Sequence, residues 1–390
     1  MKVLLINHFP LEGSGSGIYT KNLAERLYRK GHDVKVIYID NEEKEYEFDT
    51  EVIKFNTEEL SFDFPCFTTH PKSSNTFYNL SDNQLEKYVT AFTERVKNIS
   101  TDFNPDIIHT GHVWVGAYAA SKTGIPYIIT AHGTDLMGYE NDSRYHKYVE
   151  EAVKNANGII AISEHIKEKI EKVYGYSESS LILNGYDEDL FFPTGISKKE
   201  VLDRYDININ PKYIVCFAGK FTKFKGIDVL LRAAKIYEEK LNFDVVTILA
   251  GNGEEKDSMT KLSNELKLKN VFMLGHVNQD ELVSIYNVSD VSTMPSRKEP
   301  FGLVAIEAIA CGTPVVATKE GGTVDFITEE VGALIDQDDY EALAEKIIDE
   351  LTRTDKLKRA DNCHEYAFEN FSLSSFIDKV EALYNKILTK

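Results

Sequence analysis

Cysteine is scarce in this sequence and does not come in pairs. The 390 residues include 4 cysteines, and no two of them form a C-x-x-C motif. The four are Cys66, Cys216, Cys311 and Cys363. Thiols spaced so far apart rarely build a structural zinc site or a disulfide framework. We therefore expect free thiols in a reducing compartment, the cytoplasm.

Long hydrophobic runs are also missing. No segment approaches the roughly 18 consecutive apolar residues that a membrane-spanning helix requires. The opening MKVLLINHFPLEG holds only a short apolar run before His8 and Pro10, which predicts a first strand rather than a signal peptide. Neither an H-E-x-x-H motif nor an acidic pair with metal-ligand geometry occurs, so the sequence predicts no metal site and no bound cofactor.

Positive charge is outnumbered along the chain. Lys and Arg number 44 against 63 Asp and Glu, and the formal net charge is −19. Nucleic-acid backbones and anionic membranes both attract concentrated Lys and Arg. We therefore expect no nucleic-acid partner and at most peripheral membrane contact.

The chain does have a regular alternation of short apolar runs and amphipathic segments. Its 390 residues are too many for one compact core, which favours two domains. The alternation predicts an α/β protein with two doubly wound parallel sheets. The expected strands are 2–7, 34–39, 106–109, 127–130, 158–162 and 181–183, then 212–218, 244–250, 271–274, 291–294, 314–317 and 332–335. The expected helices are 17–30, 81–100, 113–123, 142–157 and 163–174, then 226–239, 254–267, 278–287, 301–311 and 338–353.

This pattern predicts two Rossmann-like domains and a closing helix. The first domain is expected over 1–190 and the second over 191–371, with a linker near 184–195. The segment 372–390 has helical periodicity and is expected to pack back on the first domain. Ligands of such sheets bind at the carboxyl ends of strands, so we expect the two domains to face a central cleft.

The stretch 297–308 is the most informative motif. It holds Glu299 and Glu307, with Gly302 between them. Glu299 is expected in a loop, and Glu307 about two turns inside the helix that follows. The N–H groups of Gly302 and Leu303 would begin that helix, and helix starts bind phosphate groups. The alternative is an ordinary surface helix with two solvated acids.

A second motif, 218–226, follows an expected strand and opens a helix. It contains Lys220 and Lys225 between Gly219 and Gly226. Two cations there could neutralise a diphosphate while the glycines keep the turn open. The alternative is a solvated cluster of lysines.

A third motif lies after the first strand, where Gly15, Ser16 and Gly17 would let a ligand approach the backbone at a helix start. The alternative is a nicotinamide dinucleotide site. Its third glycine position holds Thr20, although Asp40 ends the second strand and would suit a ribose. The imperfect match makes this alternative the weaker one.

The segment Glu-Pro-Phe-Gly-Leu-Val-Ala-Ile-Glu, 299–307, resembles the E-x7-E signature of retaining glycosyltransferases with the GT-B fold, in family 4. The resemblance continues through 308–318 into Gly321 and Gly322, and it covers nearly the whole chain in the expected order. It implies the GT-B fold, in which two Rossmann-like domains face a cleft.

The resemblance also implies roles for residues of the 297–308 motif. Glu307 would hold the ribose hydroxyls of the nucleotide, and Glu299 would contact hydroxyls of the donor sugar. Phe301, Gly302 and Leu303 would lie beside the donor.

Other segments resemble the family more loosely. Lys220 stands where the family usually has Arg, and Lys225 where it has Lys; Lys lacks the bidentate fork of Arg. His132 resembles the family's histidine that hydrogen-bonds the donor sugar, although a lone histidine is more often structural. Asp135 would orient either its loop or the acceptor. Further donor contacts are implied at Gly15, Ser16, Gly17, Asn184, Gly219, Gly253, His276 and Val277.

The resemblance implies a retaining glycosyltransferase that needs no metal ion. It would transfer a sugar from a nucleotide-diphosphate sugar, with a UDP-sugar favoured as donor. The acceptor would be a hydroxyl of a sugar or small molecule.

The irregular segment 61–80, with His70 and Tyr78, is a candidate acceptor site together with Asp135; an ordered surface loop is the alternative. A nucleotide-sugar epimerase, a glycoside phosphorylase and a non-catalytic sensor are the alternative functions. The oligomeric state is left open.

Overall fold

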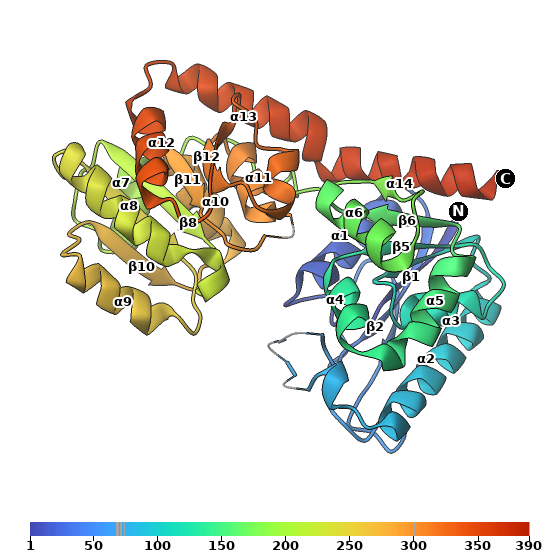
Figure 1. Ribbon diagram of the computed structural model, residues 1–390. Coiled ribbons are helices and arrows are strands. Elements are labelled where there is room, and N and C mark those ends of the chain that lie inside the picture. The colour runs from blue at the N-terminus through green and yellow to red at the C-terminus, as the bar shows by residue number, and fades with distance from the viewer. Residues whose placement is uncertain (68–69, 71, 74, 300, 390) are drawn as a thin grey trace. The chain divides into compact units, whose positions relative to one another are not determined.

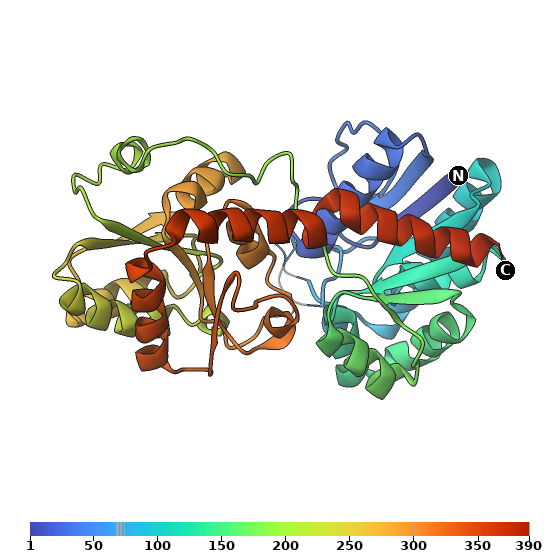
Figure 2. The same ribbon diagram turned by 90° about the horizontal axis from the view of Figure 1, so that it is seen from above.

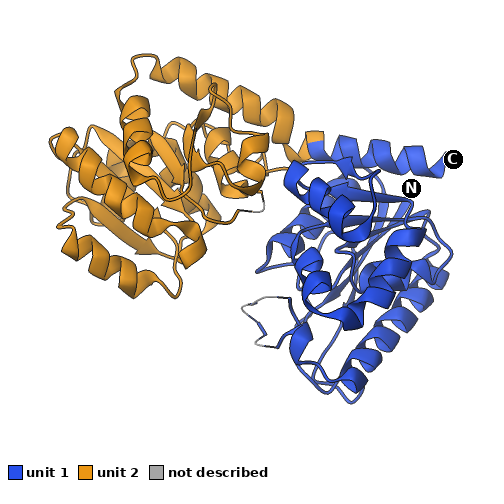
Figure 3. Cartoon of the chain, viewed as in Figure 1, with its two compact units in different colours: residues 1–184, 376–390 blue, residues 185–375 orange. Residues whose placement is uncertain are grey.

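The computed structural model describes the chain except for residues 68, 69, 71, 74, 300 and 390. It divides the chain into two units, each with its own sheet (Figure 3). Unit 1 comprises Met1–Asn184 and Phe376–Lys390, and unit 2 comprises Gly185–Ser375. The division falls at the start of the expected linker 184–195 and, near the end of the chain, inside the last helix.

Unit 1 holds a seven-stranded parallel sheet in the order β3-β2-β1-β4-β5-β6-β7 (Figure 1). Its strands are β1 (Lys2–Asn7), β2 (Asp33–Ile39), β3 (Asp49–Ile53), β4 (Ile107–Gly111), β5 (Tyr127–Ala131), β6 (Gly158–Ala161) and β7 (Ser180–Leu181). β1, an inner strand, pairs in parallel with β2 and β4. Val3, Leu4 and Ile6 have no exposed surface, as expected of an apolar run covered on both faces.

Helices lie on both faces of this sheet (Figures 1 and 2). They are α1 (Gly15–Arg29), α2 (Asp82–Phe103), α3 (Gly116–Ser121), α4 (Thr134–Asn141), α5 (His146–Asn155) and α6 (Glu164–Tyr174). The longest, α2, begins at a capping box made by Ser81 and Gln84 and ends at Asn104 in the left-handed conformation.

The last helix, α14 (Leu373–Leu388), contributes its residues from Phe376 onward to unit 1. The hydroxyl of Tyr384 lies 2.7 Å from Nδ1 of the buried His109. The Phe376 ring lies 5.2 Å from that of Tyr19 on α1. These contacts make the end of the chain part of the core of unit 1.

Unit 2 holds a six-stranded sheet in the order β10-β9-β8-β11-β12-β13. Its strands are β8 (Tyr213–Ala218), β9 (Val245–Ala250), β10 (Val271–Gly275), β11 (Val291–Met294), β12 (Val315–Thr318) and β13 (Gly332–Ile335). Its helices are α7 (Lys198–Arg204), α8 (Ile227–Lys240), α9 (Lys256–Glu265), α10 (Gln279–Val288), α11 (Leu303–Ala310), α12 (Tyr340–Thr352) and α13 (Lys356–Phe371). Two doubly wound parallel sheets confirm the predicted α/β fold class.

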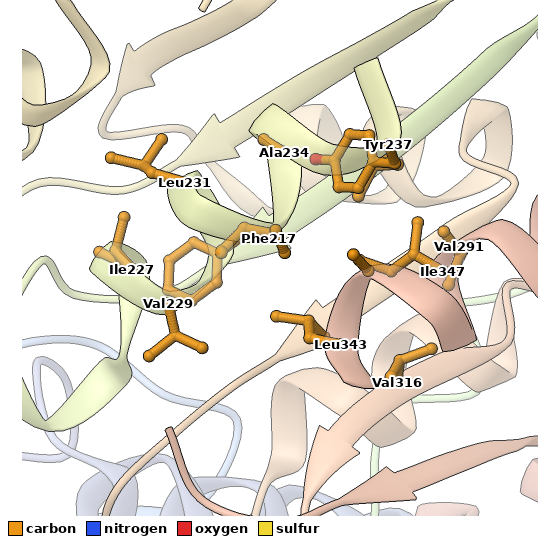
Figure 4. Packing of buried hydrophobic residues seen from close by; sticks show 14 of the residues in the cluster. Phe217, Ile227, Val229, Leu231, Ala234, Tyr237, Val291, Val316, Leu343 and Ile347 are labelled. Carbon is orange, nitrogen blue, oxygen red and sulfur yellow. The ribbon is translucent and has the colours of Figure 1, made fainter. Parts of the chain in front are cut away.

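One hydrophobic core of unit 2 lies between the sheet and the helices α8 and α12. Figure 4 shows Phe217 of β8 among Leu231 of α8 and Leu343 and Ile347 of α12. All four side chains are at most 1% exposed. This packing fixes the end of β8, and hence the start of the loop that carries Lys220 and Lys225.

Among the α-helices and strands of the described residues, four were not predicted: β3, α4, α7 and α13. β3 lies at the sheet edge and reads Asp-Thr-Glu-Val-Ile, so it lacks the apolar run of a central strand. α13 buries residues at every fourth position, but one of these is Arg359, whose guanidinium pairs with the buried Glu350. A charged residue on the buried face hides the periodic pattern that marks a helix.

Candidate functional site

The candidate site of unit 2 lies at the point where the strand order reverses. β8 has β9 on one side and β11 on the other, so the loops that follow β8 and β11 leave the same sheet edge side by side. Crevices at such switch points are where open α/β sheets bind ligands. The two loops carry the motifs 218–226 and 297–308.

Lys225 and Glu299 meet at this edge. The Lys225 ammonium donates a hydrogen bond of 2.6 Å to Glu299 Oε2. The Glu299 side chain is only 8% exposed, and Ser296 Oγ donates a second, longer hydrogen bond of 3.4 Å to the same oxygen. The structure thus brings together two residues that lie 74 positions apart in the sequence.

Gly226 is required where these loops cross. Its φ is +64°, and a Cβ atom there would lie 1.9 Å from the carbonyl oxygen of Pro295. Any side chain would push the two loops apart. The glycine therefore sets the close approach of the Lys225 and Glu299 segments.

The helix α11 starts at the same edge. Gly302 is its N-cap, with a φ of +100°, and no side chain of the described residues caps the helix. Pro300, in the motif just before it, lies outside the described residues. The Phe301 ring is buried against Phe326, with 5.6 Å between the ring centroids, so Phe301 offers a ligand its backbone rather than its ring. That Phe301 lies beside the donor stays a prediction, and the burial of its ring leaves the backbone as the part that could make the contact.

Glu307 lies closer to the start of α11 than predicted. It is the fifth residue of the helix, little more than one turn inside rather than about two. Its side chain is almost fully buried, and burial raises its pKa from an ordinary value near 4.5 to about 8. The alternative of two solvated acids is wrong for both glutamates, because Glu299 and Glu307 are each less than 10% exposed.

The other predicted donor residues of unit 2 follow neighbouring strands. Lys220 follows β8 and is 60% exposed, with Nζ 3.9 Å from Glu254. Gly253 follows β9, where a Cβ atom would lie 2.4 Å from the carbonyl oxygen of Phe221. Gly219, with a φ of +154°, His276 and Val277 also lie just beyond strand ends, and His276 is exposed. Lys220, Gly219 and Gly253 share the sheet edge with Lys225.

The glycine motif of unit 1 begins α1. The Ser14 side chain caps this helix by accepting a hydrogen bond of 3.1 Å from the amide of Gly17. A Cβ atom on Gly17 would lie 2.2 Å from the carbonyl oxygen of Pro10, whereas one on Gly15 would meet nothing within 4 Å. Packing thus requires a glycine at 17, and the ligand contacts expected of Gly15, Ser16 and Gly17 stay predictions.

Asp40 does not offer a free carboxylate for a ribose. Both of its oxygens accept hydrogen bonds from the Lys72 ammonium, at 2.9 and 2.8 Å, and the side chain is 4% exposed. Its Oδ1 also accepts from the amide of Asn41. The arrangement weakens the nicotinamide alternative, which needed Asp40 to be available.

His132 belongs to a cluster of histidines that the sequence analysis missed. Its ring centroid lies 4.7 Å from that of His112, which lies 4.6 Å from that of His8. Burial, with mutual repulsion, lowers the pKa of His132 to about 3. Buried nitrogen atoms of all three rings have no hydrogen-bond partner among the described residues. The signal that could have revealed His8 and His112 is their position directly after β1 and β4.

Asp135 is a structural residue of its loop. It is 1% exposed, and its two oxygens accept hydrogen bonds from the amides of Val113, at 3.0 Å, and Gly133, at 2.9 Å. Both oxygens are therefore occupied by the backbone. These contacts favour the alternative that Asp135 orients the His132 loop, and contact with the acceptor stays a prediction.

Replacing Asp135 by asparagine is expected to lower the free energy of unfolding by about 1–3 kcal/mol, because an amide can accept only one of the two backbone hydrogen bonds. Urea denaturation measures the change. Asp102, an exposed residue of α2, is the matched control, and its asparagine variant should stay within about 0.5 kcal/mol of the parent. Equal stability of both variants would contradict the assignment.

The remaining predicted site residues are His70, Tyr78 and Asn184. His70 is buried, with Nδ1 accepting a hydrogen bond of 3.1 Å from the amide of Lys72, and burial lowers its pKa. Tyr78 is partly exposed and follows Phe77 in a short 3-10 helix. Asn184 ends the first segment of unit 1, and its buried Oδ1 has no partner among the described residues. In the segment 61–80, residues 68, 69, 71 and 74 lie outside the described part of the chain.

The cysteines, the possible metal ligands and the helices bear on three further expectations. All four cysteines are buried and free, which confirms the predicted thiols. Among the residues the structure describes, no group of three or more His, Cys, Asp or Glu side chains could hold a metal ion. None of the described helices combines the length and apolar character that crossing a bilayer would take.

Known protein families match both halves of the chain. The family described as Glycosyltransferase Family 4 matches residues 13–190, and the family described as Glycosyl transferases group 1 matches residues 202–370. Curated relatives include an uncharacterized glycosyltransferase, MJ1607, of Methanocaldococcus jannaschii, which is 29% identical over 86% of this chain and 84% of its own length. N-acetyl-alpha-D-glucosaminyl L-malate synthase of Bacillus anthracis is 26% identical over 98% of this chain and 96% of its own length.

Solved structures share the fold. Sucrose-phosphate synthase from Thermosynechococcus elongatus superposes with a TM-score of 0.77 at 22% identity, over all of both chains. The two doubly wound parallel sheets and this superposition show the GT-B fold of glycosyltransferases. The chain belongs to glycosyltransferase family 4.

Proposed function

We propose that the chain moves a sugar from a nucleotide-diphosphate sugar to an acceptor hydroxyl with retention of configuration. The observation that carries the proposal is the meeting of Lys225 and Glu299 at 2.6 Å, at the sheet edge where α11 begins. A cation and a helix start suit the leaving diphosphate, and a buried carboxylate suits sugar hydroxyls. Glu307, inside α11, is the proposed ligand of the ribose hydroxyls.

In the proposed reaction, the bond between the anomeric carbon and the diphosphate oxygen breaks as the acceptor oxygen bonds to the same face of that carbon. The acceptor proton passes to the departing oxygen. Lys225, Lys220 and the N–H groups at Gly302 and Leu303 stabilise the negative charge that develops on the diphosphate. Glu299 and His132 position the donor sugar. The charge stabilisation comes from the chain itself, and the proposed reaction needs neither a metal ion nor a cofactor.

A UDP-sugar is the proposed donor. Alr3699/HepE of Anabaena was solved in complex with UDP and in complex with UDP-glucose, and these structures match this chain with TM-scores of 0.76 and 0.73 at 20% identity. They cover 98% or more of both chains. The proposed acceptor is a sugar or small molecule held by unit 1. The proposed compartment is the cytoplasm, where the buried thiols would stay reduced.

The test is a panel of UDP-, GDP- and ADP-sugars screened by thermal shift of the full chain, followed by acceptors with the best donor. We expect one donor class to raise the unfolding temperature, and nucleoside diphosphate to be released only when an acceptor is present. Proton NMR of the product should show the anomeric configuration of the donor. An inverted product would exclude retention, and acceptor-independent conversion of the donor sugar would indicate an epimerase.

A further inference from the structure

Arg297 joins the loops that follow β8 and β11 in unit 2. Neither its sequence motif nor the proposed reaction gives this residue a role. It follows β11, and its side chain is 18% exposed. Its Nη1 donates to the carbonyl oxygen of Lys223 at 2.8 Å and to Asp228 Oδ1 at 2.9 Å. Its Nη2 donates to Asp228 Oδ2 at 2.7 Å, and its Nε to Asp338 Oδ1 at 2.7 Å. One guanidinium therefore spans the loop after β8, the start of α8 and the turn before α12.

The backbone of Arg297 strengthens the same link. Its amide donates to the carbonyl oxygen of Phe224 at 2.7 Å. Phe224 lies between Lys223 and Lys225 in the short 3-10 helix after β8. Arg297 thus holds that helix from two directions, and it lies two positions before Glu299 on the other loop.

The charge of Arg297 is already matched by carboxylates. Asp228 and Asp338 both contact the guanidinium, and the hydrogen bonds that Arg297 donates to Asp228 are the main cause of the raised pKa of Arg297. The N–H donors of Arg297 are directed at three residues, Asp228, Asp338 and the carbonyl oxygen of Lys223, which leaves the guanidinium few donors for a diphosphate. Its five N–H donors in a rigid plane suit the bridging of fixed acceptors instead.

We infer that Arg297 is a positioning residue, which holds Lys225 against Glu299 before the donor binds. The inference rests on the proposed function, because it assigns Arg297 to the same transfer reaction. A displacement of about 1 Å in such a site can lower the rate on the order of 100-fold. A lysine at 297 could keep one ion pair but could not reach Lys223, Asp228 and Asp338 together.

The first test compares Arg297→Lys and Arg297→Met with the control Arg353→Met. Arg353 also makes a two-point ion pair, with Asp355 at 3.0 and 2.9 Å, but it joins neither loop. We expect both Arg297 variants to lose roughly 10–100-fold in kcat, while the Kd for UDP and the KM for the acceptor change less than about threefold. The control should keep parental kinetics. Parental kcat in Arg297→Lys, or a loss of UDP affinity as large as the loss in kcat, would overturn the inference.

The second test does not depend on turnover. Hydrogen–deuterium exchange of the free protein should show faster exchange over 222–226 and 296–299 in Arg297→Lys, and parental exchange in Arg353→Met. Parental exchange in Arg297→Lys would overturn the inference whatever the activity. If instead the parent transfers no sugar from any donor, the proposed function fails, and this exchange result still decides whether Arg297 holds the loops.

Discussion

Replacing Lys225 by alanine is expected to lower kcat about 100- to 1,000-fold, the range seen when one preorganised group that stabilises transition-state charge is removed. The physical reason is that the Lys225 ammonium lies at the sheet edge beside the start of α11, where the diphosphate is proposed to leave. Its 2.6 Å contact with Glu299 fixes its position in the free protein. Steady-state kinetics with the best donor of the panel measures the effect.

Lys223 provides the matched control. It has the same charge and lies in the same short 3-10 helix, but its side chain is exposed. We expect Lys223→Ala to keep kcat within about twofold, since exposed charges contribute little. Because Lys225→Ala leaves the buried Glu299 without its cation, thermal unfolding must show that the variant is folded. A folded Lys225→Ala protein with parental turnover would remove Lys225 from the reaction.

Replacing Glu307 by glutamine is expected to change both nucleotide affinity and the pH dependence of stability. A carboxylate that accepts two ribose hydroxyls contributes about 1.5–3 kcal/mol, so the affinity for UDP should fall roughly 10- to 100-fold at pH 8 and above. Isothermal titration calorimetry measures this loss. Glu345, an exposed residue of α12, is the control, and Glu345→Gln should bind UDP as the parent does.

The stability effect follows from the raised pKa of Glu307, about 8 in the folded protein against an ordinary value near 4.5. The folded state keeps the proton that the unfolded state releases, so this group stabilises the fold fully below pH 4.5. The stabilisation is lost as the pH rises to about 8, at up to about 1.4 kcal/mol per pH unit. Glutamine cannot ionise, so Glu307→Gln should gain a few kcal/mol relative to the parent between pH 5 and 8.

Urea denaturation of both proteins at pH 5, 6, 7 and 8 tests this expectation. The difference in unfolding free energy should grow steadily with pH for Glu307→Gln and stay constant for Glu345→Gln. A constant difference for both variants would show that Glu307 titrates normally in the fold. The two readouts are independent, since stability needs no nucleotide.

The position of Glu307 shows what residue spacing alone can predict about this site. Small residues and a helix pattern predicted a helix over 301–311 with Glu307 inside it, because helix starts have local chemical signals. The depth of Glu307 was overestimated, since the helix begins at Leu303 rather than at 301. Local signals locate an element more reliably than its first residue.

The histidine cluster and Asp135 show where the sequence was insufficient. His8, His112 and His132 come from separate turns, and only the order of β1, β4 and β5 in the sheet brings their rings together. Asp135 was a candidate acceptor-binding residue, because a carboxylate beside a glycine turn can orient either its own loop or the acceptor. Only the tertiary structure places the amides of Val113 and Gly133 at its two oxygens, which favours the role in the loop.

The sequence by itself determined the two parallel sheets, the motifs after their strands and the family, because apolar periodicity and glycine turns are written in neighbouring residues. The tertiary structure decided which of those motifs meet. Two contacts join residues distant in the chain: the pairing of Lys225 with Glu299 and the bridge made by Arg297. The burial that raises the pKa of Glu307 is also a product of the tertiary structure. Such contacts depend on strand order and on the close approach at Gly226, which no local pattern encodes.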